Sequence, residues 1–423
     1  MTAAILRAGA RTFLSVRKHR NYRLFFFGQV VSNTGTWMQR IAQAWLVLSL
    51  TGSPVSVGIL ALCQFMPFTL FSMVAGVVVD RLDAWRTVIG TQVTQMILAA
   101  VIATIALAGV AEPWHVYVIA GLMGLVQVLD APARQSLTFR MVGPLELPNA
   151  ISLNAGLFNG ARIFGPALGG VLIATVGAGV CFGINAASYI AVLAGLLMMR
   201  PQEFHQVAAH KRPKIIAGLK EGLSYARQEE QILLMLGLVF VVSTFCLNFN
   251  VVLPVLAKHT LDSGSETFGL LTAVFGVGAL LGALFSAHLS RATVGTAVGG
   301  SAGFALCQLL IAPLHSTTLV AVLLFVAGVC FTTWSSSSNT LIQLASPDHL
   351  RGRLVGLYFF AFAGTGTVGG ILSGWLAAVG GTQLAFGVAG IVGLSMSVYV
   401  WIRSRALDLV EEEPEENPEP VAA

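Results

Sequence analysis

Arg40 lies in the middle of an apolar run, residues 24–50, that is long enough to cross a lipid bilayer. Asn33, Thr36 and Gln43 lie in the same run. Because a helix turns by about 100° per residue, these four side chains share one sector less than half of the circumference wide. Burying an arginine at the centre of a bilayer costs about 2.5–3.5 kcal/mol. We therefore expect this polar face to line water or to bind a solute.

Arg162 repeats the arrangement in a later apolar run, with Asn159 one turn before it. Two cations in the first half of the chain predict attraction for an anionic or carbonyl-rich solute. The alternative for both is structural, because guanidinium groups inside a membrane also donate to backbone carbonyls or pair with a carboxylate such as Asp130. Asp130 is also our candidate for proton coupling, since it is the one carboxylate that we place within a predicted span.

Several other kinds of chemistry are not indicated. No lysine follows a glycine, so the GxxxxGK[ST] loop that cradles ATP phosphates is missing, and so is the HExxH metal motif. The five cysteines lie singly in apolar runs, without the spacing of a metal site or a redox pair. We expect no enzyme, no cofactor and no metal site. The expected partners are a small-molecule substrate, the lipid bilayer, and a proton gradient or membrane potential as the energy source.

Composition places these residues in membrane helices. The 423 residues are 56% hydrophobic and 10% charged, whereas soluble domains carry about 25% charged residues. Runs of about 20 mostly apolar residues predict twelve spans in an all-α membrane protein. The predicted spans are Leu24–Leu50, Pro54–Val79, Val88–Val110, Val116–Leu137, Ile151–Val176, Val180–Met199, Ile232–Leu256, Phe268–Leu289, Val294–Ala312, Leu319–Leu341, Leu354–Val379 and Gln383–Trp401.

The basic residues predict the orientation of these spans. With an even number of spans, both termini lie on one side, and that side receives all of the 24 Lys and Arg residues except three. Lys258 falls on the opposite side, while Arg40 and Arg162 fall within spans. The positive-inside rule then places both termini in the cytoplasm. Since this side carries the positive charge, the net charge of +5 does not indicate nucleic acid.

A polar segment divides the spans six and six. We predict a basic N-terminal segment (1–23), a six-helix bundle (24–200), a cytoplasmic linker with an amphipathic helix (201–230), a second six-helix bundle (231–403) and an acidic disordered tail (404–423). The two bundles show a repeat, because Gly169-Gly170 and Gly369-Gly370 occupy corresponding spans. Paired six-span bundles around a midplane cavity are a recurring transporter design.

Several short motifs occur at the ends of the predicted spans. The loop after the second span reads Gly76-Val-Val-Val-Asp80-Arg81-Leu-Asp-Ala-Trp-Arg86, and the fifth span contains Gly165-Pro166-Ala-Leu-Gly169-Gly170. Both resemble motifs of the major facilitator superfamily, the second being similar to the core of its antiporter motif. Further segments resemble the bacterial drug and siderophore exporters of that superfamily, of the enterobactin-exporter-like and macrolide-efflux-like type: Asn21-Tyr-Arg-Leu-Phe, Trp37-Met-Gln-Arg40, Leu50-Thr-Gly-Ser-Pro54, Asp130-Ala-Pro-Ala-Arg134-Gln135 and Arg351-Gly-Arg353.

The resemblance implies two pseudo-symmetric bundles and a cytoplasmic latch between them that holds while the cavity faces outward. Arg81 or Arg86 is expected to pair with Asp130. The resemblance assigns six residues to this gating latch: Gly76, Asp80, Arg81, Arg86, Asp130 and Arg134. Ser152 and Ala161 stand where the antiporter motif usually has glycine, which weakens the inference of antiport.

The implied function is export of amphipathic small molecules, drugs or siderophores, by alternating access and proton-coupled antiport. A monomer in the bacterial cytoplasmic (inner) membrane is expected. One alternative is a lysophospholipid flippase or nutrient importer of the same fold. The alternative from another class is a membrane sensor or scaffold that transports nothing.

Overall fold

The computed structural model describes residues 13–79, 81–205, 215–289, 292–347 and 350–407, and its regular elements in those ranges are all helices. The first half contains α2 (Leu14–Lys18), α3 (Arg20–Thr51), α4 (Pro54–Val79), α5 (Ala84–Leu107), α6 (Pro113–Val176) and α7 (Ala178–Leu197). The backbone leaves helical geometry inside α6 at Gly143, where φ is 72° and ψ is 179°. Since a positive φ suits glycine, this residue allows α6 to reverse into two successive spans.

The second half follows a short turn, η1 (Pro201–Glu203). It contains α8 (Ile215–Gln228), α9 (Glu230–Cys246), α10 (Phe249–Val255), η2 (Leu256–Thr260), α11 (Ser265–Leu289), α12 (Val294–Ile311), α13 (Thr317–Leu344), α14 (Arg351–Phe359), η3 (Phe360–Gly364) and α15 (Gly366–Ala406). Helix α15 breaks at Gly380 and Gly381, where the chain reverses between two spans.

These helices confirm the prediction of twelve spans. Nine helices of the described residues are long and apolar enough to cross a membrane. Two of them hold two spans each, because α6 turns at Gly143 and α15 turns at Gly380. Helix α3 is a further span that falls outside these nine, since polar side chains interrupt its apolar sequence. Polar residues inside a span are costly, and they mark α3 for a role beyond anchoring.

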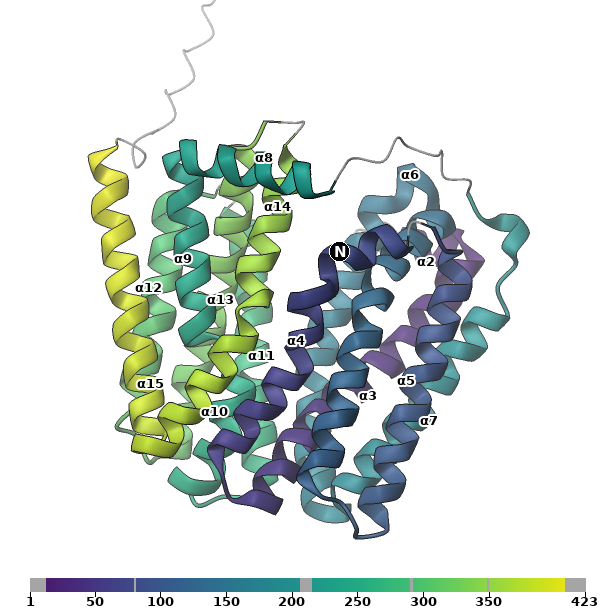
Figure 1. Cartoon of the computed structure of the whole chain (residues 1–423), viewed down its shortest axis with the longest axis horizontal. Helices are drawn as coiled ribbons and strands as arrows, with labels where there is room; N and C mark the ends of the chain where they lie inside the picture. The colour runs from purple at the N-terminus through teal and green to yellow at the C-terminus, as the bar shows by residue number, and fades with distance from the viewer. Residues whose placement is uncertain (1–12, 80, 206–214, 290–291, 348–349, 408–423) are drawn as a thin grey trace, which may run out of the picture.

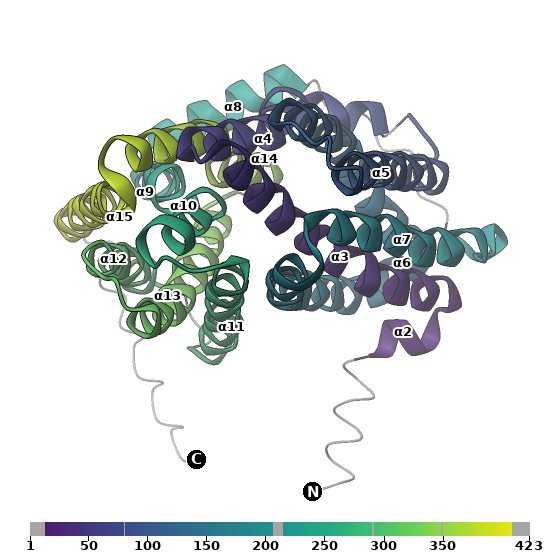
Figure 2. The same cartoon turned by 90° about the horizontal axis from the view of Figure 1, so that it is seen from below.

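The helices form two bundles that stand side by side (Figures 1 and 2). The two most extensive contacts between the bundles are those of α4 with α15 and of α6 with α11, and smaller ones join α10 to α3 and α4. Glycines make the approach close: a Cβ on Gly58 would lie 2.9 Å from the carbonyl oxygen of Gly370, and one on Gly170 would lie 2.8 Å from the Cα of Gly269. Small residues of this kind let membrane helices pack backbone against backbone.

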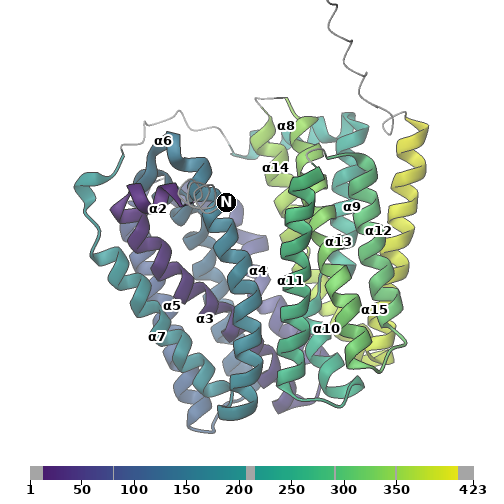
Figure 3. The ribbon, with the colours of Figure 1, turned by 180° about the vertical axis from the view of Figure 1, so that it is seen from behind.

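One end of the molecule holds α2, α8 and the last turn of α15, and we call it the α8 end (Figures 1 and 3). The amphipathic helix predicted in the linker is therefore present as α8. Ion pairs at this end join residues of the same bundle: Arg140 with Asp83 (2.7 Å), Arg403 with Glu230 (2.7 Å), Lys18 with Glu146, and Arg353 with Glu221.

At the opposite end the two bundles bind each other directly, since Lys258 Nζ donates to the Leu48 carbonyl at 3.2 Å. Between the two ends, Thr69 Oγ1 donates to the Gly364 carbonyl at 3.1 Å. The predicted acidic tail begins at residue 404, but residues 404–406 belong to α15. Residues 408–423 of that tail, residues 1–12 of the N-terminal segment and residues 206–214 of the linker lie outside the described residues.

Candidate functional site: a polar cavity between membrane helices

Two adjoining cavities, of about 690 and 330 Å³, lie among the helices of the first bundle. The larger one extends toward the α8 end, and the smaller one lies deeper along α3. Both are lined by polar side chains together with a few aromatic rings. The residues that line both cavities are Thr36, Gln95, Gln127, Phe158 and Tyr189.

The polar face predicted on α3 lines these cavities. Asn33 and Thr36 line the larger cavity, and Thr36, Arg40 and Gln43 line the smaller one. A period of 3.6 residues therefore brings the four side chains to one place, as expected from their spacing. Their binding of a solute stays a prediction. Asn159 lines neither of the two cavities, because its amide donates to the Ala155 carbonyl of its own helix at 2.9 Å.

Amide side chains from several helices connect around the cavities. Gln64 donates to Gln43 at 3.1 Å, and Asn185 donates to Gln39 at 2.6 Å. Three other amide atoms are buried without any hydrogen-bond partner in the described protein, and each belongs to a residue that lines a cavity: Gln29 Nε2, Gln43 Nε2 and Gln92 Oε1. Since buried polar groups nearly always find partners, these atoms point to water or a solute in the cavity.

Sequence reasoning did not assign Gln29, Gln135 and Tyr189 to the cavity. Gln29 precedes Asn33 by four residues on α3, so the helical period was a signal that could have identified it. Tyr189 lies on α7, and its hydroxyl is 3.3 Å from Thr36 Oγ1. Only the packing of α7 against α3 brings these two groups together.

Asp130 is fully buried beside the larger cavity and is fully bonded. Its Oδ1 accepts from Thr91 Oγ1 at 2.5 Å and from Gln92 Nε2 at 3.0 Å. Its Oδ2 pairs with Arg134, four residues later on the same helix. Arg134 also donates to Gln29, which accepts from Asn33 Nδ2 at 3.0 Å as well. A hydrogen-bonded chain thus runs from the carboxylate to the cavity face of α3.

The pairing of Asp130 with Arg81 or Arg86, predicted for the outward-facing state, is not formed in this conformation. Both arginines are exposed, whereas Asp130 is bound by residues of its own bundle. Asp80 lies outside the described residues, and Gly76 lies within α4 at a point where the surroundings are not described.

Asp83, at the N-terminus of α5, forms an ion pair with Arg140. Its Oδ1 caps α5 by accepting from the Arg86 amide at 2.9 Å, and its Oδ2 pairs with Arg140 at 2.7 Å. Partial burial alone would raise the pKa of Asp83, but the bonds from Arg140 and from the Arg86 amide outweigh it, and the pKa lies below its usual value of 3.8.

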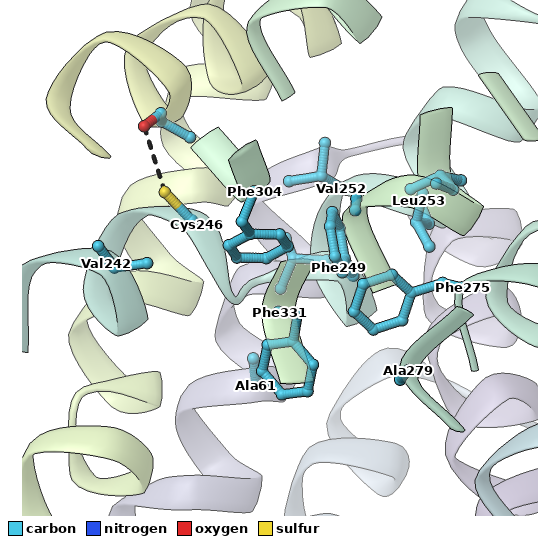
Figure 4. Close-up of a cluster of buried hydrophobic side chains, with 14 of the residues drawn as sticks. Ala61, Val242, Cys246, Phe249, Val252, Leu253, Phe275, Ala279, Phe304 and Phe331 are labelled. Atoms are coloured by element: carbon cyan, nitrogen blue, oxygen red, sulfur yellow. Dashed lines mark hydrogen bonds between the residues drawn. The ribbon is translucent and has the colours of Figure 1, made fainter. Parts of the chain in front are cut away.

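The second bundle presents aromatic rings where the first presents amides. Phe249, Phe275, Phe304 and Phe331 face one another in its core (Figure 4), with ring centroids 4.7 Å apart for Phe249 and Phe275. A further cavity of about 390 Å³ lies nearer the α8 end and is lined by the polar run of α13, from Ser335 to Gln343. Tyr358 closes one side of it by donating to the Ser335 carbonyl at 2.9 Å.

The motif Gly165–Gly170 of the fifth span lies where α6 packs against α3 of its own bundle and against α11 of the second bundle. Cβ atoms on Gly165 and Gly169 would meet Trp37 and Met38 of α3 at 2.5 and 3.2 Å, and Gly170 lies against α11. Pro166 is buried, and its carbonyl oxygen lies 2.6 Å from the place of a Cβ on Gly269. These four residues thus leave room for α3 on one side and α11 on the other.

The segment from Gly299 to Gly303 matches the GxSxG pattern of serine hydrolases. That pattern requires a sharp turn between strand and helix, with an exposed serine. Here Ser301 is fully buried within α12 and its hydroxyl lies 2.8 Å from that of Ser397. The hydroxyl therefore joins two helices.

Two bundles of six spans with a polar cavity among them define a multi-pass membrane transporter. A family model described as transmembrane secretion effector matches residues 12–422. The chain belongs to this family, within the major facilitator superfamily, which confirms the predicted fold and the resemblance noted in the sequence.

Two relatives of the chain have names that state a transport role. It is 28% identical to multidrug efflux pump Tap of Mycolicibacterium fortuitum over 91% of this chain and 97% of the relative. It is 25% identical to the staphyloferrin A transporter of Staphylococcus aureus, over 92% and 98%. In structure it resembles the nucleoside transporter NupG, with a TM-score of 0.70, 12% identity and coverage of 92% of this chain and 100% of that one.

Proposed function

We propose that this protein exports amphipathic small molecules, drugs or siderophores, across the bacterial cytoplasmic membrane by alternating access. The observation that carries the proposal is the pair of polar cavities on α3, in the middle of a bundle whose outer surface is apolar. A relative named multidrug efflux pump supports the direction, and that relative and one named staphyloferrin A transporter support the kind of solute.

Alternating access is supported by the distribution of contacts between the bundles. They bind each other at the end opposite α8, through Lys258 and Leu48 and through paired glycines, while the ion pairs at the α8 end stay within one bundle. With the α8 end in the cytoplasm, as the positive-inside rule requires, this arrangement suits a cavity that opens inward. In the outward-facing state the loop with Asp80, Arg81 and Arg86 would form the latch. The glycines of α6 would let it rock against α11.

Proton coupling is proposed to involve Asp130. Protonation would remove the negative charge that holds Arg134, and the freed guanidinium could then reorganise Gln29 and Asn33 on the cavity face. A proton arriving from one side would in this way alter the solute site. We propose that a single chain carries out the cycle, because helices of one bundle surround both cavities.

Proteoliposomes with an imposed pH gradient test this function. We expect the purified protein to move at least one compound from a panel of lipophilic drugs and siderophores against its concentration gradient. Asp130→Asn should still bind that compound but lose gradient-driven accumulation. Glu203→Gln is the matched control, because its carboxylate is exposed at the α8 end and pairs with Arg200 of the same turn. Failure to move any compound in either direction would contradict the proposal.

A further inference from the structure

Two partly buried cations lie near the same aromatic ring. The guanidinium carbon of Arg40 lies 4.8 Å from the centroid of Trp37, and that of Arg162 lies 6.0 Å from it. Arg40 and Trp37 come from α3, whereas Arg162 comes from the second span of α6. Two positive charges near one ring repel each other, and an anion between them would remove this repulsion.

The described protein supplies no anion for these two cations. Among the described residues, neither Arg40 nor Arg162 forms an ion pair or a hydrogen bond, although each guanidinium carries five N–H donors. Asp130, the carboxylate buried in the same bundle, is already bonded to Arg134, Thr91 and Gln92. The structural alternative from the sequence, in which Asp130 neutralises Arg40 or Arg162, is therefore not realised in this conformation.

Aromatic rings hold the two guanidinium groups in place without satisfying their donors. Arg162 lies over Phe275 at 5.2 Å and over Phe331 at 5.1 Å, both in the second bundle. Rings attract a cation through their negative faces, but they leave its in-plane N–H groups free for an acceptor. Arg40 lines the smaller cavity, beside Gln43, Gln64 and Phe158, so an acceptor that enters this cavity reaches its guanidinium.

We propose that Arg40 and Arg162 form a binding site for an oxyanion of the transported solute, a carboxylate above all. This inference rests on the proposed function and narrows it to anionic amphipathic solutes. A carboxylate accepts two parallel N–H bonds from a guanidinium, and such charge-assisted bonds are the strong ones. The apolar part of the solute lies against Phe158, which packs edge-on against Trp37 with centroids 5.5 Å apart.

The site also connects the solute to the contact between the bundles. Because Arg162 rests on Phe275 and Phe331 of the second bundle, an anion that draws it toward Arg40 weakens this contact. Solute binding and the movement of the bundles are then linked through one side chain.

Binding of three matched probes tests the site. Naphthylacetate, naphthylethanol and naphthylethylamine share a ring system and differ in a negative, neutral or positive group. Equilibrium dialysis against the purified protein in a neutral detergent measures their binding, with protein-free micelles as the blank. We expect the acid to bind at least about tenfold more tightly than the alcohol and the amine.

Variants of the two arginines test whether these side chains cause the preference for the acid. Arg40→Gln and Arg162→Gln should each reduce the preference for the acid by about tenfold, and Arg40→Lys should retain part of it. Arg405→Gln is the matched control, because Arg405 also lies over a tryptophan, Trp401 at 4.7 Å, but at the end of α15. A Gln variant that fails to fold is replaced by the Lys variant, whose charge is kept while its bidentate geometry is lost.

Equal binding of the three probes by the unmodified protein would overturn the site, as would a preference for the amine, or a preference for the acid that survives Arg40→Gln and Arg162→Gln. The transport assay separates this outcome from failure of the proposed function. Export without a preference for acids overturns only the oxyanion site. Selective binding of the acid by a protein that moves no compound overturns the proposed function and leaves the site in place.

Discussion

In the first bundle, glutamine, asparagine and threonine side chains surround two cavities, whereas in the second bundle aromatic rings pack directly against one another. The two bundles share one helical plan, so the difference lies in the side chains that face the centre. Three amide atoms without a partner belong to residues that line the two cavities of the first bundle. The second bundle has its aromatic cluster at the centre, and its polar side chains lie mostly around the separate cavity of α13. From this comparison we expect the first bundle to bind the solute and the second bundle to provide a rigid, closely packed surface.

The largest expected effect separates stability in the second bundle from binding in the first. Phe304 is fully buried among four other aromatic rings, so Phe304→Ala should lower the free energy of unfolding by about 3–5 kcal/mol. Gln127→Ala, in a residue that lines both cavities, should cost less than about 1 kcal/mol and weaken solute binding instead. Thermal melting in detergent and equilibrium dialysis measure the two effects. A stable Phe304→Ala protein would remove the distinction.

A buried ion pair provides the next test within the first bundle. Asp130→Ala removes a fully buried carboxylate and leaves Arg134, Thr91 and Gln92 without their acceptor, which should cost about 3 kcal/mol of unfolding free energy. Asp83→Ala breaks a partly exposed pair and should cost less than about 1 kcal/mol. Equal melting temperatures for the two variants would show that Asp130 is not held as the structure places it.

A glycine at the contact between the bundles has a smaller expected effect. Gly170→Ala places a Cβ 2.8 Å from backbone atoms of Gly269 and Ser265, so it should separate α6 from α11 and cost about 1–3 kcal/mol. Gly156→Ala changes the same helix at a point where nothing lies within 4 Å, and it should leave melting unchanged or raise it slightly. Measuring both in one series controls for the helix preference of alanine. An unchanged melting temperature for Gly170→Ala would mean that α6 and α11 are less closely packed than the structure places them.

The smallest expected effect is the pH dependence of the Asp83–Arg140 pair. Because the pKa of folded Asp83 lies below its usual value of 3.8, the pair stabilises the protein above that pH and loses this contribution as the pH falls through the lower folded value. Its contribution should be less than about 1 kcal/mol, since both side chains are partly exposed. The melting difference between the unmodified protein and Arg140→Gln should shrink on acidification. A difference that grows instead would contradict this assignment.

Much of the fold follows from the sequence, because span length and the placement of basic residues depend on the bilayer alone. The predicted span Pro54–Val79 coincides with α4, and the others agree within a few residues except where helices continue through turns, as α6 does to Gly143. The polar residues of α3 have two consequences. They lower its hydropathy, so that it is not among the nine strongly apolar helices, and they line the cavity.

The site was predictable where helical period decides contacts and not where packing between helices does. Thr36 and Arg40 line the cavity because their spacing puts them on one face. The pairing of Asp130 with Arg134 was readable from a spacing of four residues, yet the resemblance favoured Arg81 or Arg86. The place of Arg162 over Phe275 depends on how α6 meets α11, which no local pattern in the sequence encodes.

The reactivity of a cysteine on α3 tests most directly whether its polar face meets water inside the membrane. In a protein whose five native cysteines are replaced, Thr36→Cys and Val31→Cys are treated with a maleimide that cannot cross the bilayer, applied from the α8 side of inverted vesicles. Val31 is an exposed apolar residue, about 140° around the helix from Thr36. Faster labelling at Thr36→Cys, slowed by a transported solute, is the predicted result. Labelling no faster than at Val31→Cys would show that the interior is dry and that the cavity is no route for a solute.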